Sequence, residues 1–247
     1  MVGPPFAISV VIPVRDEAQS VGSLVREVDR ILSGDENSMY EIIVVDDGSL
    51  DGTFRDLRRL GEEIGSLRLV RLREPVGQSG AIWMGVRHAR AHWIATLDGD
   101  GQNDPADIGK LWRIGRRHDI GGTPPLVIGC RTDRRGSARR RATSWILNRM
   151  SAIFLQHDIV DRGSGIKMFR RDDFLALPRF DHMHRFLPAL FRMRNGKIIS
   201  VSVNDRPRRH GRSHYGNVSR IIESVIDICG MFWLRSRFIE PDMCAEN

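Results

Sequence analysis

Residues 41–49 read Glu-Ile-Ile-Val-Val-Asp-Asp-Gly-Ser, and they give the clearest indication of the fold class. Four consecutive aliphatic residues without polar alternation are typical of a strand that is buried on both faces of a sheet. The run stops at Asp46, where the following Gly-Ser pair marks a turn. Ile8–Val14 and Trp93–Leu97 have the same form, and the second is followed directly by Asp98. Each run therefore predicts a buried strand that ends in a polar loop.

Helical segments separate these strands. Apolar residues at helical spacing predict helices over 17–32, 53–64 and 79–91, and a further strand at Leu67–Leu72. Strands that alternate with helices of this length predict a mostly parallel sheet with right-handed crossovers. Ligands of such sheets bind beyond the carboxyl ends of the strands. Three polar clusters fall at those ends: Arg15, Asp16 and Glu17; Asp46, Asp47, Gly48 and Ser49; and Asp98, Gly99 and Asp100.

The second half of the chain continues in the same manner. Periodicity predicts helices at 105–117, 139–156, 184–194 and 218–238, and strands at 126–130, 165–170 and 197–203. The fold class is therefore α/β, with a mostly parallel central sheet flanked by helices and with amphipathic helices toward the C-terminus. No apolar run approaches the roughly 18 residues that a membrane span needs, and we expect no transmembrane helix. The N-terminus lacks the pattern of an export signal.

Charge is distributed unevenly along the 247 residues. The chain has a formal net charge of +7, but residues 1–105 carry 11 basic and 17 acidic side chains, whereas residues 106–247 carry 27 and 14. An acidic half joined to a basic half predicts a carboxylate-lined site in the first and an anion-facing surface in the second. A solvated surface with an accidental bias is the alternative. Three cysteines without metal-ligand spacing suit a reducing compartment such as the cytoplasm.

Arginine is concentrated in two clusters, which suits phosphate oxygens because a guanidinium fork binds them in a bidentate manner. The clusters are Arg131, Arg134, Arg135 and Arg139–Arg141, and Arg206, Arg208, Arg209 and Arg212. A nucleic-acid backbone, anionic lipid headgroups and a lipid phosphate all fit such a surface. No helix-turn-helix, zinc-finger or aromatic RNA-binding signature accompanies the arginines, and we expect no nucleic-acid partner.

The acidic clusters suggest two kinds of chemistry. Asp98 and Asp100 supply two hard oxygen donors one glycine apart, which describes a Mg²⁺ or Mn²⁺ site completed by water and substrate phosphates. The alternative is a loop that precedes a helix beginning near Asp104. Asp46 and Asp47 are adjacent acids after a buried strand, and they need a positive or hydrogen-bond-donating neighbour. A nucleobase N–H or a ribose hydroxyl would serve, and an ordinary turn before the next helix is the alternative.

Four blocks of the first half resemble, in order and spacing, the nucleotide-sugar domain of glycosyltransferase family 2, whose fold is called GT-A. They are Pro13-x-x-x-Glu17, Asp46-Asp47-Gly48-Ser49-x-Asp51-Gly52-Thr53, Gly77-x-x-Gly80 and Asp98-Gly99-Asp100-x-Gln102. Four later blocks are similar to the dolichol-phosphate mannosyltransferase-like branch, which makes dolichyl- or polyprenyl-phosphate sugars. They are Gly129-x-Arg131, Gly163-Ser164-Gly165-Ile166-Lys167, Arg185-Phe186-Leu187-Pro188 and Arg208-x-x-Gly211-x-Ser213.

The resemblance covers residues 8–217 and implies one domain, 1–217. Its nucleotide-sugar-binding half would be 1–105 and its acceptor-binding half 106–217, with a helix and tail at 218–247. Three groups of site residues are implied by position. The nucleotide-sugar site would contain Pro13, Arg15, Glu17, Asp46, Asp47 as the base-reading acid, Ser49, Gly77 and Gly80. The catalytic group would be Asp98 and Asp100 as metal and diphosphate ligands, Gln102 beside the sugar or metal, and Arg208 over the diphosphate. The acceptor phosphate would meet Arg131, Arg139 or Arg140, and Ser213.

The resemblance implies an inverting glycosyltransferase that uses Mg²⁺ or Mn²⁺. It would move a hexose of mannose or glucose type from a GDP- or UDP-sugar to polyprenyl or dolichyl phosphate, in the cytoplasm at the inner membrane face. A family 2 enzyme that acts on a hydroxyl, with Asp161 as its base, is one alternative. A basic nucleic-acid- or lipid-binding module with a vestigial nucleotide pocket is another. Amphipathic segments 142–155 and 218–238 predict peripheral membrane contact, while the second also suits a membrane-anchoring partner or a homo-oligomer.

Overall fold

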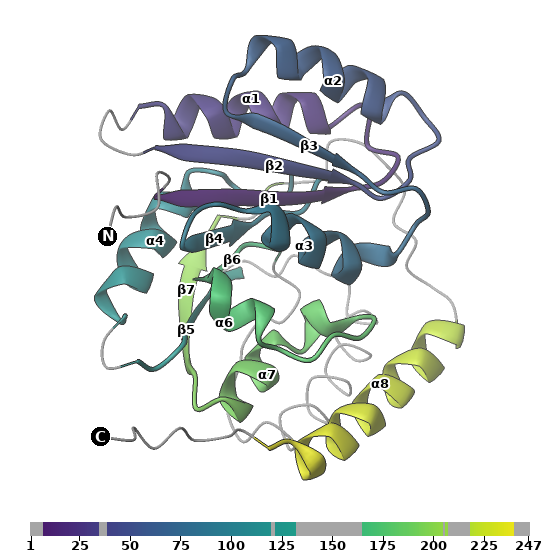
Figure 1. Ribbon diagram of the computed structural model, residues 1–247, viewed down its shortest axis with the longest axis vertical. Helices are drawn as coiled ribbons and strands as arrows, with labels where there is room; N and C mark the ends of the chain where they lie inside the picture. The colour runs from purple at the N-terminus through teal and green to yellow at the C-terminus, as the bar shows by residue number, and fades with distance from the viewer. Residues whose placement is uncertain are drawn as a thin grey trace, which may run out of the picture.

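The computed structural model describes residues 7–34, 39–119, 122–131, 165–204, 206 and 218–239. These residues form a single seven-stranded sheet with helices on both faces (Figure 1). The elements in chain order are β1 (Ile8–Val14), α1 (Val21–Leu32), β2 (Tyr40–Asp46), α2 (Thr53–Glu63), β3 (Leu67–Arg71), α3 (Gly77–His88), β4 (Trp93–Thr96), α4 (Asp107–Arg117), β5 (Pro125–Arg131), β6 (Lys167–Arg170), α6 (Arg171–Leu175), the 3-10 helix η1 (Met183–Arg185), α7 (Leu187–Met193), β7 (Lys197–Val203) and α8 (Val218–Arg237).

The strand order is β3-β2-β1-β4-β6-β5-β7. β1 to β4 run parallel, as do β5 and β7, and β6 is antiparallel to both of its neighbours. The predicted α/β class and mostly parallel sheet are confirmed. Because β1, β2 and β4 are parallel, their carboxyl ends and the acid-bearing loops that follow lie at one edge of the sheet.

Two hydrophobic clusters hold the layers together. Side chains of β1 and β2 alternate between them, so Ile42 and Val44 pack toward α1, α2 and α4, whereas Ile43 and Val45 pack toward α3, α6 and α7. Burial on both faces explains why the middle of each strand, Val10–Ile12 and Ile42–Val45, is apolar without alternation. Figure 1 shows α1 and α2 on one side of the sheet and α3 and α7 on the other.

Several element boundaries differ from the sequence expectation. The first helix begins at Val21 instead of residue 17, and the third begins two residues early, at Gly77. The helix expected at 184–194 is divided into η1 and α7. The short helix α6 was not predicted, and the helix expected at 139–156 lies outside the described residues.

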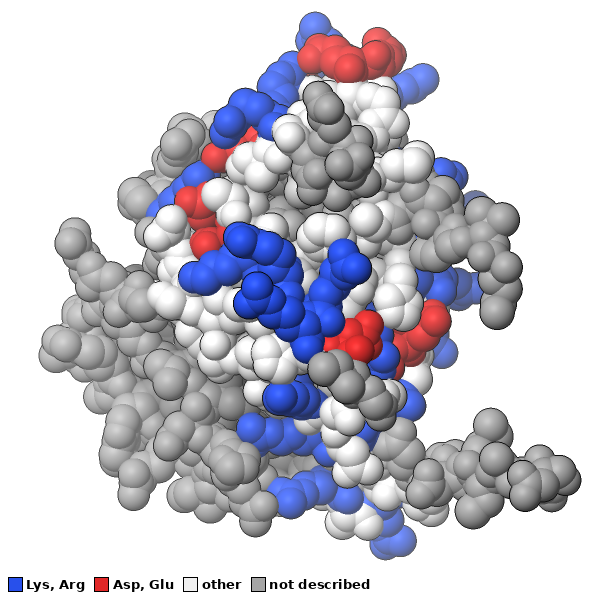
Figure 2. Space-filling model, turned by 90° about the vertical axis from the view of Figure 1, so that its left-hand side faces the viewer, with Lys and Arg blue, Asp and Glu red and all other residues white. Residues whose placement is uncertain are grey.

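One charged surface of the basic half of the chain, residues 106–247, lies on α4. Its exposed basic side chains are Lys110, Arg113, Arg116 and Arg117. Figure 2 looks onto the side of the molecule that carries α4 and shows Lys and Arg grouped there, with acidic side chains at the border of the group. Across the described parts of the chain, no helix combines the length and the hydropathy that a bilayer-crossing segment requires.

Candidate functional site

The loops after β1, β2 and β4 are joined directly at the carboxyl edge of the sheet. The backbone N–H of Asp47 donates to the carbonyl of Val14, at 2.9 Å. Gly99 lies against the end of β1, where a Cβ would come within 2.7 Å of Val14 Cγ1 and 3.1 Å of the carbonyl of Pro13. Ser20 Oγ also donates to the carbonyl of Gly99, at 3.1 Å. The three clusters that the sequence places far apart are therefore adjacent.

A second set of hydrogen bonds fixes the β1–α1 loop to the β2–α2 loop. Asp16 has a positive φ of 54°, and its backbone N–H donates to Ser49 Oγ at 3.0 Å. Asp16 Oδ1 accepts from the N–H of Leu50, at 2.8 Å, and the N–H of Glu17 donates to Thr53 Oγ1, at 2.9 Å. Ser49 thus contributes to the shape of this edge, and Arg15, which was predicted beside the nucleoside, is exposed at its rim.

Asp46 is the last residue of β2 and is 1% exposed. Its Oδ1 accepts from the N–H of Ser49, at 3.0 Å. Its Oδ2 lies 3.5 Å from Arg71 Nε, and among the described residues nothing donates a hydrogen bond to that oxygen. A buried carboxylate oxygen without a donor is costly. Asp46 therefore keeps an acceptor that a ligand N–H or O–H could satisfy.

Asp47 is also buried and is bound to the start of α3. Its two carboxylate oxygens accept from the N–H groups of Val76, at 2.7 Å, and Gly77, at 2.9 Å. Both donors lie at a helix N-terminus, where an anion is favoured. The adjacent acids needed positive or donating neighbours, and Arg71 and the α3 amides provide them. Asp47 remains our predicted base-reading acid, although its oxygens already have partners within the protein.

The first turn of α3 also reaches Asp98. Gln78 Nε2 donates to Asp98 Oδ1 at 2.8 Å, and the backbone N–H of Asp98 donates to Asn103 Oδ1 at 3.0 Å. Gly165 packs so closely that a Cβ there would overlap Asp98 Oδ2. Asp47 and Asp98 thus converge on three consecutive residues, 76–78. Neither Gln78 nor Asn103 was predicted, because nothing in an amide side chain identifies its partner. Gln78 binds a carboxylate beyond the next strand, and Asn103 binds a backbone N–H within its own loop.

Asp100 lies on the same loop, where its Oδ1 accepts from the N–H of Gln102, at 3.1 Å. Within the described part of the chain, no group of three or more His, Cys, Asp and Glu side chains is placed to hold a metal ion. Mg²⁺ in nucleotide sites is usually held by one or two carboxylates together with substrate phosphates and water. Two half-buried carboxylates on one short loop fit that donor set.

The predicted glycines shape the start of α3. Gly77 has a φ of +78°, which a residue with a side chain rarely adopts, and this conformation brings its N–H to Asp47. A Cβ on Gly80 would come within 3.0 Å of Val76 Cβ, so this glycine allows the preceding loop to close against the helix. Both glycines therefore have a structural reason to be where they are.

A histidine and a serine connect this turn to the second half of the chain. Ser79 Oγ accepts from the backbone N–H of His184, at 3.2 Å, and its hydroxyl lies 2.7 Å from His184 Nδ1. Burial lowers the pKa of His184 to about 3, and the charges of Lys167, Arg185 and His182 act in the same direction. The imidazole is therefore neutral at physiological pH, and a Ser79 hydroxyl that donates to Nδ1 leaves the ring hydrogen on Nε2.

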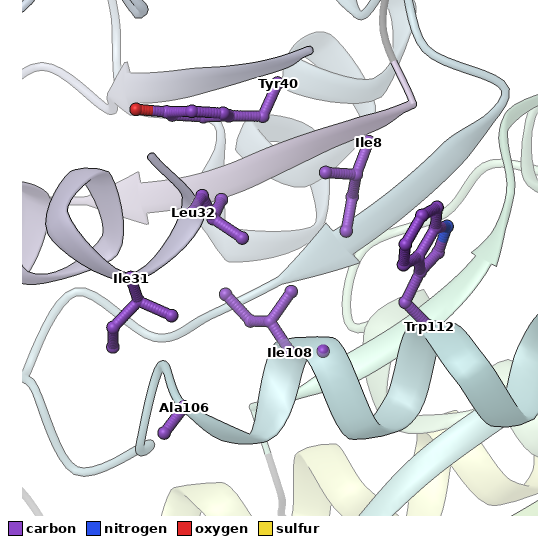
Figure 3. Close-up of a pocket in the computed structure, with 8 residues that line it drawn as sticks. Ile8, Ile31, Leu32, Tyr40, Ala106, Ile108 and Trp112 are labelled. Carbon is purple, nitrogen blue, oxygen red and sulfur yellow. The ribbon is translucent and has the colours of Figure 1, made fainter. Parts of the chain in front are cut away.

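A pocket of about 340 Å³ lies beside the β2–α2 loop. Its lining residues are Gly48, Ser49, Leu50, Arg71, Leu72 and Arg73. Of these, the sequence placed only Ser49 in the nucleotide-sugar site. A smaller pocket of about 130 Å³ lies between α1 and α4, near the first residues of β1 and β2 and so at the opposite edge of the sheet (Figure 3). Its lining side chains are apolar apart from the hydroxyl of Tyr40 and the indole N–H of Trp112.

Some predicted residues lie outside the described part of the chain. They are Arg139, Arg140, Arg208, Ser213, the alternative base Asp161 and the side chain of Arg131. Their roles remain predictions. Arg206 belongs to the second arginine cluster and is described; it binds Glu27 and Asp104.

Comparison with known proteins gives the family that the sequence motifs predict. The family model for glycosyl transferase family 2 matches residues 9–177. Dodecaprenyl-phosphate galacturonate synthase of Rhizobium johnstonii is 34% identical over 92% of this chain and 67% of its own length. Undecaprenyl-phosphate 4-deoxy-4-formamido-L-arabinose transferase of Edwardsiella ictaluri is 31% identical over 90% and 66%. The chain thus spans about two thirds of the length of these relatives.

Two solved structures have the same fold. Glucosyl-3-phosphoglycerate synthase from Mycobacterium tuberculosis, crystallised with Mn²⁺, UDP and phosphoglyceric acid, has a TM-score of 0.69 at 17% identity and covers 96% of this chain and 80% of its own. Mannosyl-3-phosphoglycerate synthase from Rubrobacter xylanophilus has a TM-score of 0.68 at 19% identity, over 96% and 77%. The GT-A fold, the acids gathered at the carboxyl edge of its sheet and the family match lead to one conclusion: the chain belongs to glycosyl transferase family 2.

Proposed function

We propose that the protein transfers a sugar from a UDP-sugar to a polyprenyl phosphate. The observation that carries this proposal is the convergence of Asp47 and Asp98 on residues 76–78, because it joins the predicted nucleotide-binding and cation-binding loops into one edge. The relatives named above support the acceptor, since both act on polyprenyl phosphates. The structural neighbour that contains UDP and Mn²⁺ favours UDP over GDP.

The base of the nucleotide would occupy the pocket beside Ser49 and Arg71. That pocket begins at Gly48, directly after Asp47, which remains the predicted base-reading acid. The buried Oδ2 of the neighbouring Asp46 could accept a second N–H or O–H of the nucleoside. Arg71 and Arg73 would face the carbonyl oxygens of the base or the ribose. Arg15, at the exposed rim of the same edge, would stay near the nucleoside as the sequence predicts.

Asp98 and Asp100 would hold a divalent cation that neutralises the charge developing on the departing diphosphate. The side chain of Gln78 on α3 donates a hydrogen bond to Asp98, and the backbone N–H of Gln102 donates one to Asp100. In the transfer step, an oxygen of the acceptor phosphate forms a bond to the anomeric carbon from the face opposite the diphosphate. The bond between that carbon and the diphosphate oxygen breaks, and nucleoside diphosphate leaves with the electron pair, which inverts the configuration.

A lipid phosphate needs little help as a nucleophile. Its second pKa lies near 6 by analogy with phosphomonoesters, so it is largely dianionic at neutral pH. No residue therefore has to remove a proton. Arg131, Arg139, Arg140 and Ser213 remain our predicted acceptor-phosphate ligands, and Arg208 remains the residue predicted over the diphosphate.

Membrane contact is part of the proposal, and α8 would provide it. The inner side of α8 contacts the protein through Ile228, Met231 and Leu234, and Asp227 Oδ2 binds His182 Nδ1 at 2.8 Å. Its other side exposes apolar side chains: Val225, Ile226, Phe232 and Trp233. Exposed Arg235 and Arg237 follow in the last turn. An apolar strip next to cations suits a helix lying in the headgroup layer of a cytoplasmic membrane face.

The test is a direct transfer assay. Purified protein is incubated with Mn²⁺, a polyprenyl phosphate and radiolabelled UDP-glucose, UDP-galacturonate or GDP-mannose in turn. We expect a mild-acid-labile lipid-linked sugar from at least one UDP-sugar and none in the presence of EDTA. Polyprenol, which lacks the phosphate, serves as the matched acceptor.

Each other outcome has a definite meaning. Product on polyprenol but not on polyprenyl phosphate would identify a transferase that acts on hydroxyls. Product from GDP-mannose alone would overturn the assignment of the nucleotide. Failure to bind any nucleotide sugar in the presence of Mn²⁺ would favour a binding module instead of an enzyme.

A further inference from the structure

Arg206 lies three residues beyond the end of β7 and connects three parts of the molecule. Its Nη1 and Nη2 donate to the two carboxylate oxygens of Glu27 on α1, at 2.8 and 2.9 Å. Its Nη2 also donates to Asp104 Oδ1, at 2.7 Å. The backbone N–H of Arg206 donates to the carbonyl of Gln102, at 3.0 Å. Arg206 therefore holds the loop that carries Asp98 and Asp100 at two separate points.

The residue between those two points orients Asp98. Asn103 is buried, and its Oδ1 accepts from the backbone N–H of Asp98 at 3.0 Å. Gln102, on its other side, donates its N–H to Asp100. A movement at Gln102 or Asp104 would therefore reach both carboxylates of the cation-binding loop.

Asp104 has further bonds that make this contact rigid. Its Oδ1 accepts from the N–H of Ala106 at 3.0 Å, just before α4, and its Oδ2 accepts from Asn204 Nδ2 at 3.3 Å. Burial alone would raise the pKa of Asp104, but the hydrogen bonds from Ala106 and Asn204 and the charge of Arg206 hold it below its usual value. The Asp104 carboxylate is thus ionised when it meets Arg206.

The contact differs in kind from an ordinary surface ion pair. Arg26, the neighbour of Glu27 on α1, pairs with Glu63, and both side chains are more than half exposed, at 55% and 59%. In the Arg206 cluster the exposed fractions are 29% for Arg206, 27% for Glu27 and 11% for Asp104. Bidentate, partly buried pairs hold a fixed geometry, whereas exposed pairs contribute little.

We infer that Arg206 is a positioning residue for the cation-binding loop: it ties Gln102 and Asp104 to α1 so that Asp98 and Asp100 are preorganised for a divalent cation and diphosphate. The inference rests on the proposed function for the role of those two acids. Outer-shell residues of this kind typically change metal affinity when they are lost. Glu27 acts in the same chain of contacts, because it supports Arg206 from the side away from the loop.

The test compares Arg206→Ala and Arg206→Lys with Arg26→Ala as the matched control. Hydrogen exchange of peptides covering 98–106 is measured by mass spectrometry on the protein without ligand. Mn²⁺ affinity in the presence of UDP is measured by electron paramagnetic resonance. For Arg206→Ala we expect exchange to accelerate in 98–106 and Mn²⁺ affinity to fall by about tenfold or more. Lysine cannot bridge both carboxylates in the same way, and Arg206→Lys should recover only part of each property. Arg26→Ala should leave both unchanged.

Glu27→Gln keeps the inference falsifiable if Arg206→Ala does not fold. Glutamine has nearly the same shape but provides only one acceptor oxygen to the guanidinium, so exchange in 98–106 should again accelerate, by a smaller factor. Unchanged exchange in 98–106 for both Arg206→Lys and Glu27→Gln would overturn the inference. A wild-type protein that binds no Mn²⁺ with UDP would instead overturn the cation assignment of the proposed function, and the exchange data would still decide the role of Arg206.

Discussion

Asp98 and Asp100 belong to one loop but have different surroundings. Asp98 is held by Gln78 from α3, by Asn103 within the loop and by the close approach of Gly165. Asp100 is bound by the N–H of Gln102. Replacing Asp100 removes one of the two predicted cation ligands and leaves these contacts of Asp98 in place.

The Asp100→Asn variant should lose at least about a hundredfold in Mn²⁺-dependent transfer rate, because it removes one anionic ligand from the charge-stabilising group. The melting temperature should stay close to the wild-type value. The measurement is initial rate of lipid-linked sugar formation at saturating donor. Asp172→Asn, at an exposed position on α6, is the control and should remain active. Turnover near the wild-type rate in Asp100→Asn would remove this residue from the cation site.

His184 makes the stability of the protein depend on pH. Its pKa is about 3 in the folded protein but near 6.5 in an unfolded chain. The unfolded state therefore binds the extra proton first, and the contribution of neutral His184 is complete above pH 6.5 and is lost as the pH falls toward 3. In His184→Gln, the unfolding free energy should depend less steeply on pH between 4 and 6.5, by up to ~1.4 kcal/mol per pH unit.

Urea unfolding at a series of pH values measures this slope for each protein. His92→Gln, at an exposed position, controls for the loss of a histidine elsewhere in the chain. Identical slopes for wild type and His184→Gln would mean that the imidazole titrates normally in the fold, and that the Ser79 contact does not depend on its being neutral.

The sequence predicts those candidate site residues whose position alone is informative. Asp46, Asp47, Asp98 and Asp100 lie at the carboxyl ends of apolar strands or in the loops that follow them. Parallel topology brings such positions to one edge of a sheet. Gln78, Asn103 and Arg206 could not be found in this way, because each depends on how a particular loop folds back. The same limit applies to Asp47, whose capping of α3 becomes visible only once residues 76 and 77 are placed.

Helix α3 is packed closely on the sheet. A Cβ on Gly85 would overlap Val11 Cγ1 and come within 3.0 Å of Val45 Cγ2. The start of α3 carries the bonds to Asp47 and Asp98, so the depth of its packing also sets the geometry of the site. Gly61 in α2 provides a contrast, since no atom lies within 4 Å of the place where its Cβ would be.

These two glycines should respond to alanine in opposite directions. Gly61→Ala should stabilise the protein by roughly 0.5–1 kcal/mol, because alanine is the better helix former and the space is free. Gly85→Ala gains the same propensity but has to displace two buried valines, and a net loss of roughly 1–3 kcal/mol is expected. Chemical denaturation measures both. A stabilised Gly85→Ala would show that α3 can move away from β1 at little cost.

The sequence predicted most helices and strands to within two or three residues, and the exceptions have local causes. The first helix starts late because residues 17–20 form a turn, with Ser20 Oγ bound to Glu17. The helix expected at 184–194 is interrupted after η1, where Phe186 leaves helical geometry. Hydrophobic periodicity indicates which residues are buried. The exact ends of a helix depend on local hydrogen bonds that the hydrophobic pattern does not show.

Helix α8 carries apolar side chains both on the side that packs against the protein and on the side that faces solvent. Its exposed strip includes Trp233 at 66% and Ile226 at 64%. If this strip contacts lipid, the double variant Ile226→Ser/Trp233→Ser should bind anionic vesicles at least about tenfold more weakly, because each large apolar side chain contributes about 1.5–3 kcal/mol when buried. Co-sedimentation with phosphatidylglycerol vesicles is the measurement.

Met39→Ser is the control for that experiment, since Met39 is also exposed but precedes β2, far along the chain from α8. Vesicle binding that is unaffected by the double variant would mean that this strip does not contact lipid. Concentration-dependent association of the wild type, lost in the same variant, would instead assign the strip to a second copy of the chain.

The strand order of the central sheet also affects how the chain folds during synthesis. β6 lies between β4 and β5 although it follows both along the chain. During synthesis β4 is complete at Thr96, but its neighbour begins only at Lys167, so one edge of β4 stays open while the ribosome translates the intervening message. Open edge strands are templates for pairing with other chains. The nascent chain is therefore most exposed to aggregation during this interval, and slow codons between the two strands would lengthen the risk.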